Sequence, residues 1–116
     1  MSIDLTSINR KIIQFRNDRD WEQYHDPKNL VQALGIESAE LQEIFLWKST
    51  EESRHLRQNE IDRVKEELAD IFIYMTYICH AFKIDLFNEV LKKIEKNAVN
   101  YPIEKSKGSN KKYNQL

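Results

Sequence analysis

Two pairs of carboxylate side chains are the residues of this sequence best suited to chemistry. Glu37 and Glu40 form the first pair, and Glu67 and Asp70 form the second. Within each pair the residues are three positions apart in a stretch of helical character, so they lie on the same face of a helix. Each helix therefore presents two carboxylates side by side.

Both pairs interrupt the apolar stripe of their own helix. Glu37 occupies the place of a core leucine between Leu34 and Leu41, and Glu67 and Asp70 border the stripe of the later helix. Inward carboxylates are costly unless positive charge meets them, and these faces carry no lysine or arginine. The pattern predicts a divalent metal held by oxygen ligands. A pair of exposed helices is the alternative, since 32% of the residues are charged.

Helical periodicity runs through most of the chain and predicts an all-α fold. With only two glycines and two prolines, the sequence has little material for the tight turns of an all-β protein. We expect helices at residues 6–21, from 27 to 47 or 48, 59–82 and 86–99. Asp26 before Pro27 is a helix start signal, and Asn59 and Asp85 are the expected N-caps of the later helices. A polar loop or short helical turn is expected over residues 48–59.

Composition narrows the class of protein. A length of 116 residues fits one domain, and a net charge of −1 argues against a dedicated nucleic-acid binder. Cys79 is the single cysteine, so no internal disulfide can form, which fits a reducing cytosol and a cytoplasmic location. No apolar run approaches the ~18 residues of a membrane span, and Met1-Ser2-Ile3-Asp4 begins no signal peptide. We therefore expect no membrane association.

The last residues differ in character from the rest of the chain. We divide the sequence into a helical domain over residues 1–102 and a basic C-terminal tail over residues 103–116. The tail contains four lysines against one acidic residue, Glu104, and so has a net charge of +3. It is either a solvated terminus or a basic flap over an anionic ligand.

Aromatic side chains flank the acidic pairs. They are Trp21, His25, Trp47 and Tyr74. Trp47 follows Glu40 by seven residues and Tyr74 follows Asp70 by four, spacings that keep each ring on the face of its acidic pair. Rings beside a metal–carboxylate cluster could stack on a nucleobase, which contributes about 1–3 kcal/mol per base. Packing in the core is the alternative for each of them.

Longer motifs accompany the carboxylates. They are Asp20-Trp21-Glu22-Gln23-Tyr24-His25, Pro27-x-Asn29-Leu30, Glu43-x-Phe45-x-Trp47-Lys48, Glu66-Glu67-Leu68-Ala69-Asp70-x-x-x-Tyr74, Asn97, Tyr101-Pro102 and Lys112-Tyr113. Together with Glu37-x-x-Glu40, they resemble the MazG-type all-α nucleotide pyrophosphohydrolases, and most closely the dCTP pyrophosphatase branch. The resemblance covers nearly the whole chain from the first helix onwards.

The resemblance implies a fold, an assembly and a reaction. The fold is a four-helix MazG-like bundle that packs into a homo-oligomer, a homotetramer or a tight dimer, with sites built between subunits. The reaction is Mg²⁺-dependent hydrolysis of a nucleoside triphosphate to the monophosphate and pyrophosphate, with Mn²⁺ as a substitute. The implied substrate is dCTP or a related deoxynucleotide, in house-cleaning of nucleotide pools.

The resemblance also assigns roles to individual residues. The implied Mg²⁺ ligands are Glu37, Glu40, Glu67 and Asp70, and we take Glu40 and Glu67 as catalytic. The residues expected around the nucleotide are Trp21, His25, Trp47 and Tyr74, with Asn97 as a phosphate contact. Ile12 departs from the pattern, because animal members carry a histidine at this place in the first helix. This departure leaves the preference for base and sugar open.

Other functions remain open on the sequence. The same chemistry could act on dUTP, dATP or a modified triphosphate. A non-enzymatic metal-binding helical bundle belongs to a different class, but di-iron bundles normally use Glu-x-x-His, and neither Glu37 nor Glu67 is followed by histidine at that spacing. A helical interaction module, such as an antitoxin-like partner, would leave the inward carboxylates unexplained.

Overall fold

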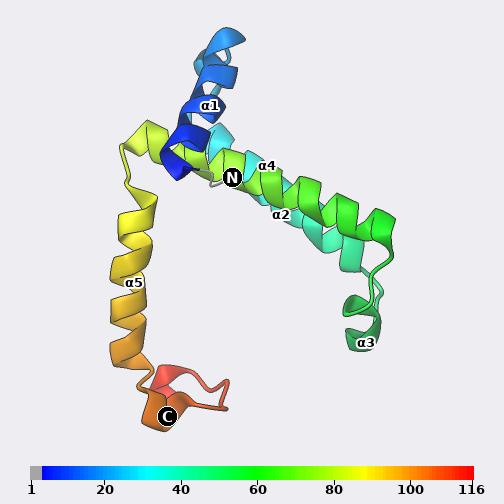
Figure 1. Ribbon diagram of the computed structural model, residues 1–116, viewed down its shortest axis with the longest axis vertical. Helices are drawn as coiled ribbons and strands as arrows, with labels where there is room; N and C mark the ends of the chain where they lie inside the picture. The colour runs from blue at the N-terminus through cyan, green and yellow to red at the C-terminus, as the bar shows by residue number, and fades with distance from the viewer. Residues whose placement is uncertain (1–3) are drawn as a thin grey trace. The chain divides into compact units, whose positions relative to one another are not determined.

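The computed structural model describes residues 4–116. The expectation that no signal peptide begins at Met1 concerns residues 1–3 and so lies outside the described residues. The described residues form helices and connections without a β-strand, which confirms the all-α class (Figure 1). The long helices are α1 (Leu5–Asp18), α2 (Pro27–Phe45), α4 (Gln58–Phe82) and α5 (Leu86–Asn100). The short segments are η1 (Glu22–Tyr24), α3 (Thr50–Ser53), α6 (Ile103–Ser106) and η2 (Tyr113–Gln115).

The chain forms two compact units, one ending at Lys83 and the other spanning Ile84–Leu116. In the first unit α2 and α4 pack along each other, and α1 contacts α4 (Figure 1). Leu30 and Ile44 of α2 and Tyr77 of α4 are buried apolar side chains in this unit. The packing of α2 against α4 therefore forms the core of the first unit. Across residues 4–116, no helix has the length and hydropathy needed to cross a membrane.

The predicted N-caps of α2 and α5 are confirmed. The Asp26 carboxylate accepts a hydrogen bond of 2.8 Å from the backbone N–H of Asn29, and Asp85 accepts one of 3.2 Å from that of Asn88. Each bond satisfies an N–H group that the first turn of a helix leaves without a partner. The starts of these two helices are therefore encoded by local side chains.

The start of α4 differs from the prediction. The helix begins at Gln58 with Arg57 as N-cap, so the prediction of Asn59 as the cap was wrong. The Glu60 carboxylate accepts a hydrogen bond of 3.0 Å from the backbone N–H of Arg57 and forms an ion pair of 2.6 Å with Nζ of Lys48. The Lys48 ammonium and then the Arg57 N–H lower the pKa of Glu60 from its usual 4.5 to about 2.

Two helices end earlier than their sequence pattern predicted. The first helix ends at Asp18 instead of Trp21, and α2 ends at Phe45 instead of Trp47 or Lys48. The backbone leaves the helical region differently at the two stops. Asp20, shortly after α1, has a positive φ of 54°, whereas Leu46, directly after α2, has an extended ψ of 131° and precedes Trp47 with a φ of 68°. A residue in the left-handed region cannot continue a right-handed helix. None of these positions is a glycine, so no residue type marked either stop.

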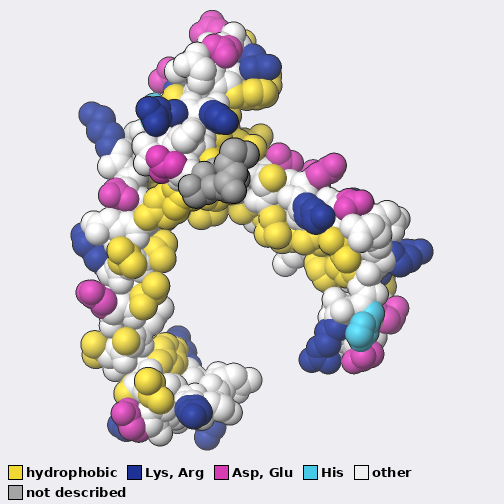
Figure 2. Space-filling model, in the orientation of Figure 1, with side chains coloured by type: hydrophobic (Ala, Val, Ile, Leu, Met, Phe, Trp, Pro, Cys, Tyr) yellow, Lys and Arg dark blue, Asp and Glu magenta, His cyan; other side chains and the backbone are white. Residues whose placement is uncertain are grey.

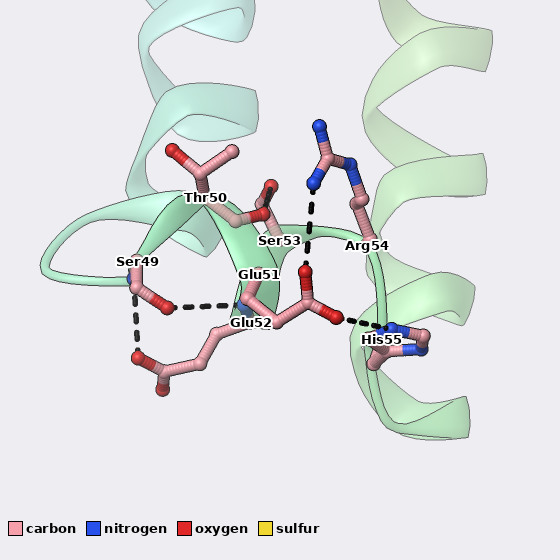
Figure 3. Close-up of polar contacts among 7 residues, drawn as sticks. All are labelled: Ser49, Thr50, Glu51, Glu52, Ser53, Arg54 and His55. Atoms are coloured by element: carbon pink, nitrogen blue, oxygen red, sulfur yellow. Dashed lines mark hydrogen bonds and ion pairs between the residues drawn. The ribbon is translucent and has the colours of Figure 1, made fainter.

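The connection between α2 and α4 is held by its own side chains (Figure 3). The Ser49 hydroxyl accepts a hydrogen bond from the backbone N–H of Glu52, and the Glu52 carboxylate accepts one from the N–H of Ser49, both at 3.1 Å. This reciprocal pair is a capping box at the start of α3. Glu51 then pairs with Arg54 at 3.5 Å and with Nε2 of His55 at 3.0 Å. The short helical turn expected in this region is thus confirmed.

The second unit carries an amphipathic helix and a short C-terminal fold. Large apolar side chains gather along α5 and remain exposed (Figure 2), and they include Phe87, Val90, Leu91 and Ile94. The segment predicted as a basic tail contains α6 and η2. In it, Tyr113 packs edge-on against Tyr101 with ring centroids 6.0 Å apart, and the Ser106 hydroxyl donates to the carbonyl of Pro102 at 2.7 Å.

Candidate active site

Packing of α2 against α4 brings the two acidic pairs together. Glu37 of α2 and Glu67 and Asp70 of α4 each offer a carboxylate oxygen, and these oxygens all lie within 4.8 Å of one another. Glu40, one turn further along α2, lies outside this three-residue cluster. Its charge nevertheless reaches Glu37 and helps to raise the pKa of that carboxyl group. The carboxylate cluster, as we call Glu37, Glu67 and Asp70, thus draws on both helices.

The carboxylate cluster lacks internal compensation for its charge. In the described chain, Oε2 of Glu37 and Oε2 of Glu67 are buried without a hydrogen-bond partner. Burial, followed by the facing carboxyl group of Glu67, raises the pKa of Glu37 from its usual 4.5 to about 7, and the charges of Asp70 and Glu40 add to the shift. The cluster therefore holds a proton at neutral pH or requires an external cation.

The chemistry of the donor set indicates which cation would fit. All donors are carboxylate oxygens, and hard divalent ions such as Mg²⁺ and Mn²⁺ prefer oxygen ligands. Two of the oxygens are buried and free of hydrogen bonds, so a cation would replace no existing interaction. The cluster is thus a candidate site for a divalent metal.

An apolar cavity of about 450 Å³ opens beside the carboxylate cluster. Ile8, Ile12 and Phe15 of α1 line one side, and Tyr74 of α4 lines the other. Asp70 lines the cavity as well, although it also belongs to the cluster. A ligand in the cavity could therefore reach the carboxylates from an apolar and aromatic environment.

Three of the predicted aromatic residues line this cavity, namely Trp21, His25 and Tyr74. The Trp21 ring packs edge-on against Phe15 at 5.8 Å, and the His25 ring lies 4.7 Å from that of Tyr77. Burial is the main cause that lowers the pKa of His25, which favours the neutral imidazole. These rings give the cavity flat surfaces on which a base could stack.

Two predicted site residues lie elsewhere. Trp47 is 91% exposed in the segment after α2 and does not line the cavity. Asn97 is an exposed residue of α5, in the second unit. Their roles at the site stay predictions.

Sequence reasoning missed several residues of the cavity wall. They are Ile8, Lys11, Phe15, Ile73 and Tyr77. The 3.6-residue period of Ile8, Ile12 and Phe15 was visible, but such a stripe normally indicates a packed core face. Phe15, at 45% exposure, does not belong to such a core. Sequence spacing alone therefore carried no signal that this stripe lines a cavity.

Comparison with known proteins agrees with this geometry. Residues 33–116 match the family model described as MazG-like family. Over 114 residues, the chain is 40% identical to dCTP pyrophosphatase 1 of Bos taurus, with 97% of this chain and 68% of the relative covered. It is 37% identical to dCTP pyrophosphatase 1 of Homo sapiens, with 97% and 67% covered.

A solved structure supports the same relationship. The fold is similar to the crystal structure of a pyrophosphatase from Archaeoglobus fulgidus, with a TM-score of 0.81 and 36% sequence identity. The likeness covers 88% of this chain and 95% of that chain. The resemblance expected from the motifs is thereby confirmed, and the chain belongs to the MazG-like family.

Proposed function

We propose that this protein is a Mg²⁺-dependent nucleotide pyrophosphohydrolase that converts dCTP to dCMP and pyrophosphate. The observation that carries the proposal is the position of Asp70, which belongs to the carboxylate cluster and also lines the apolar cavity. A nucleotide in the cavity would have its phosphates beside the carboxylates and its base among the rings. The similarity to proteins named dCTP pyrophosphatase 1 and pyrophosphatase supports the same activity.

We assign the metal to the four acidic residues predicted from the sequence. They are Glu37, Glu40, Glu67 and Asp70, and Mn²⁺ would serve as a substitute for Mg²⁺. The orphaned buried oxygens of Glu37 and Glu67 support the assignment. A bound Mg²⁺ would neutralise phosphate charge and lower the pKa of a water molecule. Because a proton competes for Glu37 near pH 7, metal affinity should rise with pH.

The carboxylates would also take part in proton transfer. Formation of dCMP requires a water oxygen to attack the α-phosphorus while the bond from that phosphorus to the α–β bridging oxygen breaks. Pyrophosphate leaves with the bridging oxygen. We assign the proton of the attacking water to a carboxylate oxygen of Glu40, which lies outside the three-residue cluster. Glu67, with its buried free oxygen, would help to hold the Mg²⁺ that neutralises the charge of the reacting phosphate.

The nucleoside would occupy the apolar cavity. Trp21, His25 and Tyr74 provide rings for stacking on the base, as the sequence predicted. Ile8 and Ile12 line the same cavity, and neither can form a hydrogen bond to a base edge. That apolar wall favours a second candidate within the same chemistry, hydrolysis of dUTP, dATP or a modified triphosphate.

Self-association is part of the proposal, with a homotetramer expected and a dimer as the alternative. Trp47 is 91% exposed, and the apolar side chains of Leu91 and Ile94 on α5 are 62% and 58% exposed. Further copies of the chain could cover these side chains and bring Trp47 and Asn97 to shared sites. Light scattering tests this, and a particle of 13.9 kDa at micromolar concentration would contradict it.

Incubation with each common ribo- and deoxynucleoside triphosphate and Mg²⁺ tests the proposed reaction. We expect the highest kcat/KM for dCTP and equal amounts of monophosphate and pyrophosphate, without inorganic phosphate. Preference for another nucleotide would replace dCTP by that substrate. Binding of Mg²⁺ without turnover of any nucleotide would instead favour a metal-binding helical bundle. We place the activity in the cytoplasm, where nucleotide pools are held.

A further inference from the structure

Arg16 is a buried charged residue that the proposed chemistry does not use. Its exposure is 4%, whereas Arg10 and Lys11 on the same helix are exposed. Burial of a guanidinium group costs free energy unless hydrogen bonds and opposite charge compensate for it. An apolar side chain of similar volume would fill this space at lower cost. The charge of Arg16 therefore calls for an explanation beyond packing.

The guanidinium group joins the end of α1 to the segment that follows it. Nε and Nη2 of Arg16 donate to Oδ1 of Asn17 at 3.1 and 2.9 Å, and Nη2 lies 3.5 Å from a carboxylate oxygen of Glu22. The backbone carbonyl of Arg16 accepts a hydrogen bond of 3.2 Å from the N–H of Trp21. The side chain of Arg16 thus links α1 to the start of η1 through Glu22, and its backbone carbonyl contacts Trp21.

The same guanidinium faces the ring of Tyr77, against which His25 packs. Cζ of Arg16 lies 6.0 Å from the ring centroid of Tyr77, and the His25 ring lies 4.7 Å from it. Both His25 and Tyr77 line the cavity, but Arg16 does not. Nδ1 of His25 is buried without a hydrogen-bond partner in the part of the chain that the structure describes. No hydrogen bond of Nδ1 therefore fixes the His25 ring, which packs against Tyr77.

We propose that Arg16 is a positioning residue of the nucleotide site: its guanidinium, paired with Glu22 and facing Tyr77, holds the wall formed by Trp21 and His25 against α4. The identity of the ligand rests on the proposed function, whereas the contacts of Arg16 do not. Because Arg16 lies behind the wall, it acts on the substrate only through these neighbours.

The electrostatic surroundings of His25 offer a direct readout of this arrangement. The titratable and charged groups that face it or share its cavity are Lys11, Arg16, Glu22, Asp70, Tyr74 and Tyr77. After burial, the charge of Arg16 is the next cause that lowers the pKa of His25, and the charge of Glu22 raises it. Removal of the Arg16 charge should therefore move the titration midpoint of His25 upwards.

Arg16→Met is the decisive variant, with Arg10→Met as a matched control on the exposed side of the same helix. We expect Arg16→Met to raise KM for the best nucleotide about five- to tenfold, with kcat changed less than about twofold, because binding geometry and not the reacting atoms is altered. The His25 signal, identified by NMR through its loss in His25→Gln, should titrate at higher pH. Arg10→Met should match the wild type in both measurements.

The NMR titration is made without nucleotide, so it judges the role of Arg16 even if the proposed reaction fails. A folded Arg16→Met protein with unchanged KM and unchanged His25 titration would overturn the inference. If Arg16→Met does not fold by circular dichroism, Arg16→Lys decides, because lysine retains the charge but loses the planar fork. Arg16→Lys should keep the His25 midpoint and raise KM. Wild-type KM in that variant would overturn the inference as well.

Discussion

Glu60 and Glu67 lie two turns apart on α4, yet their carboxylates have opposite surroundings. Seven residues separate them, so both point from the same face of the helix. Glu60 forms a 2.6 Å ion pair with Lys48 and accepts a 3.0 Å hydrogen bond from the N–H of Arg57. Glu67 has a buried oxygen without a hydrogen-bond partner among residues 4–116, and its neighbours in the carboxylate cluster are acidic.

The contrast separates a carboxylate that is paired within the fold from the carboxylates of the candidate metal site. The pKa of Glu60 is lowered to about 2 by Lys48, whereas the pKa of Glu37 in the carboxylate cluster is raised to about 7 by burial. Near one end of the α2–α4 pair, Lys48 provides positive charge to Glu60. The described residues provide no such partner to the buried oxygens of Glu37 and Glu67. A buried charge without a partner is costly, so its persistence points to function at the cluster.

Removal of divalent metal should give the largest effect, and only at the carboxylate cluster. We expect no turnover in excess EDTA, with recovery on addition of Mg²⁺ or Mn²⁺, because the unpartnered oxygens of Glu37 and Glu67 need a cation. Mg²⁺ should also raise the Tm of the wild type by binding the folded state. Full activity in the chelator would contradict the metal assignment.

Substitutions in the carboxylate cluster should lower activity, whereas a substitution at the Glu60–Lys48 ion pair should lower stability. We expect Glu67→Gln and Asp70→Asn to lower kcat about a hundredfold or more. Both should stay folded, and their metal-free Tm at neutral pH should match or exceed that of the wild type, because repulsion among carboxylates falls. Circular dichroism and the pyrophosphate assay measure the two effects. Wild-type rates in either variant would remove that residue from the site.

Glu60→Gln is the matched substitution in the ion-paired region. It leaves Lys48 without its buried partner, so we expect a lower Tm than the wild type and a kcat within about threefold of it. A loss of activity equal to that of Glu67→Gln, in a protein that is still folded, would show that the comparison between the two glutamates is wrong.

Trp47 tests whether the ion-paired region also serves the substrate, since it directly precedes Lys48 and is 91% exposed. We expect Trp47→Ala to raise KM about tenfold with a smaller change in kcat, because stacking acts on ground and transition states alike. Phe82→Ala, at an exposed aromatic residue of α4, is the control. Unchanged KM together with a smaller particle in light scattering would show that Trp47 packs between copies instead.

The sequence predicted the features that depend on spacing within one helix. The acidic pairs and the N-caps Asp26 and Asp85 belong to this group, because each involves neighbours within four residues. The partners of Glu60 do not, since Lys48 is twelve residues away across a connection whose path the sequence left open. The turn that ends α2, in which an extended Leu46 precedes the positive φ of Trp47, could not be predicted either, because no glycine marks it.

The cavity shows a different limit of prediction. Ile8, Ile12 and Phe15 have the spacing of a core-facing stripe, and the same spacing suits the wall of a cavity. Whether such a stripe is covered depends on how closely α1 approaches α4 along its length. That distance is a property of tertiary packing, so the pattern indicated the face correctly but not what lies against it.

The smallest of the predicted effects should be the dependence of stability on pH. Glu37 and Glu60 should contribute to it with opposite sign. The pKa of Glu37 in the folded protein, about 7, is above its usual 4.5, so its contribution is complete below pH 4.5 and is lost as the pH rises through 7. The pKa of Glu60, about 2, is below its usual 4.5, so its contribution is present above pH 4.5 and is lost as the pH falls towards 2.

Thermal unfolding of metal-free protein from acid to neutral pH measures both contributions. We expect Glu37→Gln to flatten the decline in Tm between pH 4.5 and 7, and Glu60→Gln to flatten the decline below pH 4.5. Saturating Mg²⁺ should remove only the first decline, because a cation at the cluster replaces the proton on Glu37. If the decline in Tm between pH 4.5 and 7 is unchanged in Glu37→Gln, the carboxylates of the cluster are satisfied without a cation. The cluster would then not differ from Glu60 in its need for positive charge.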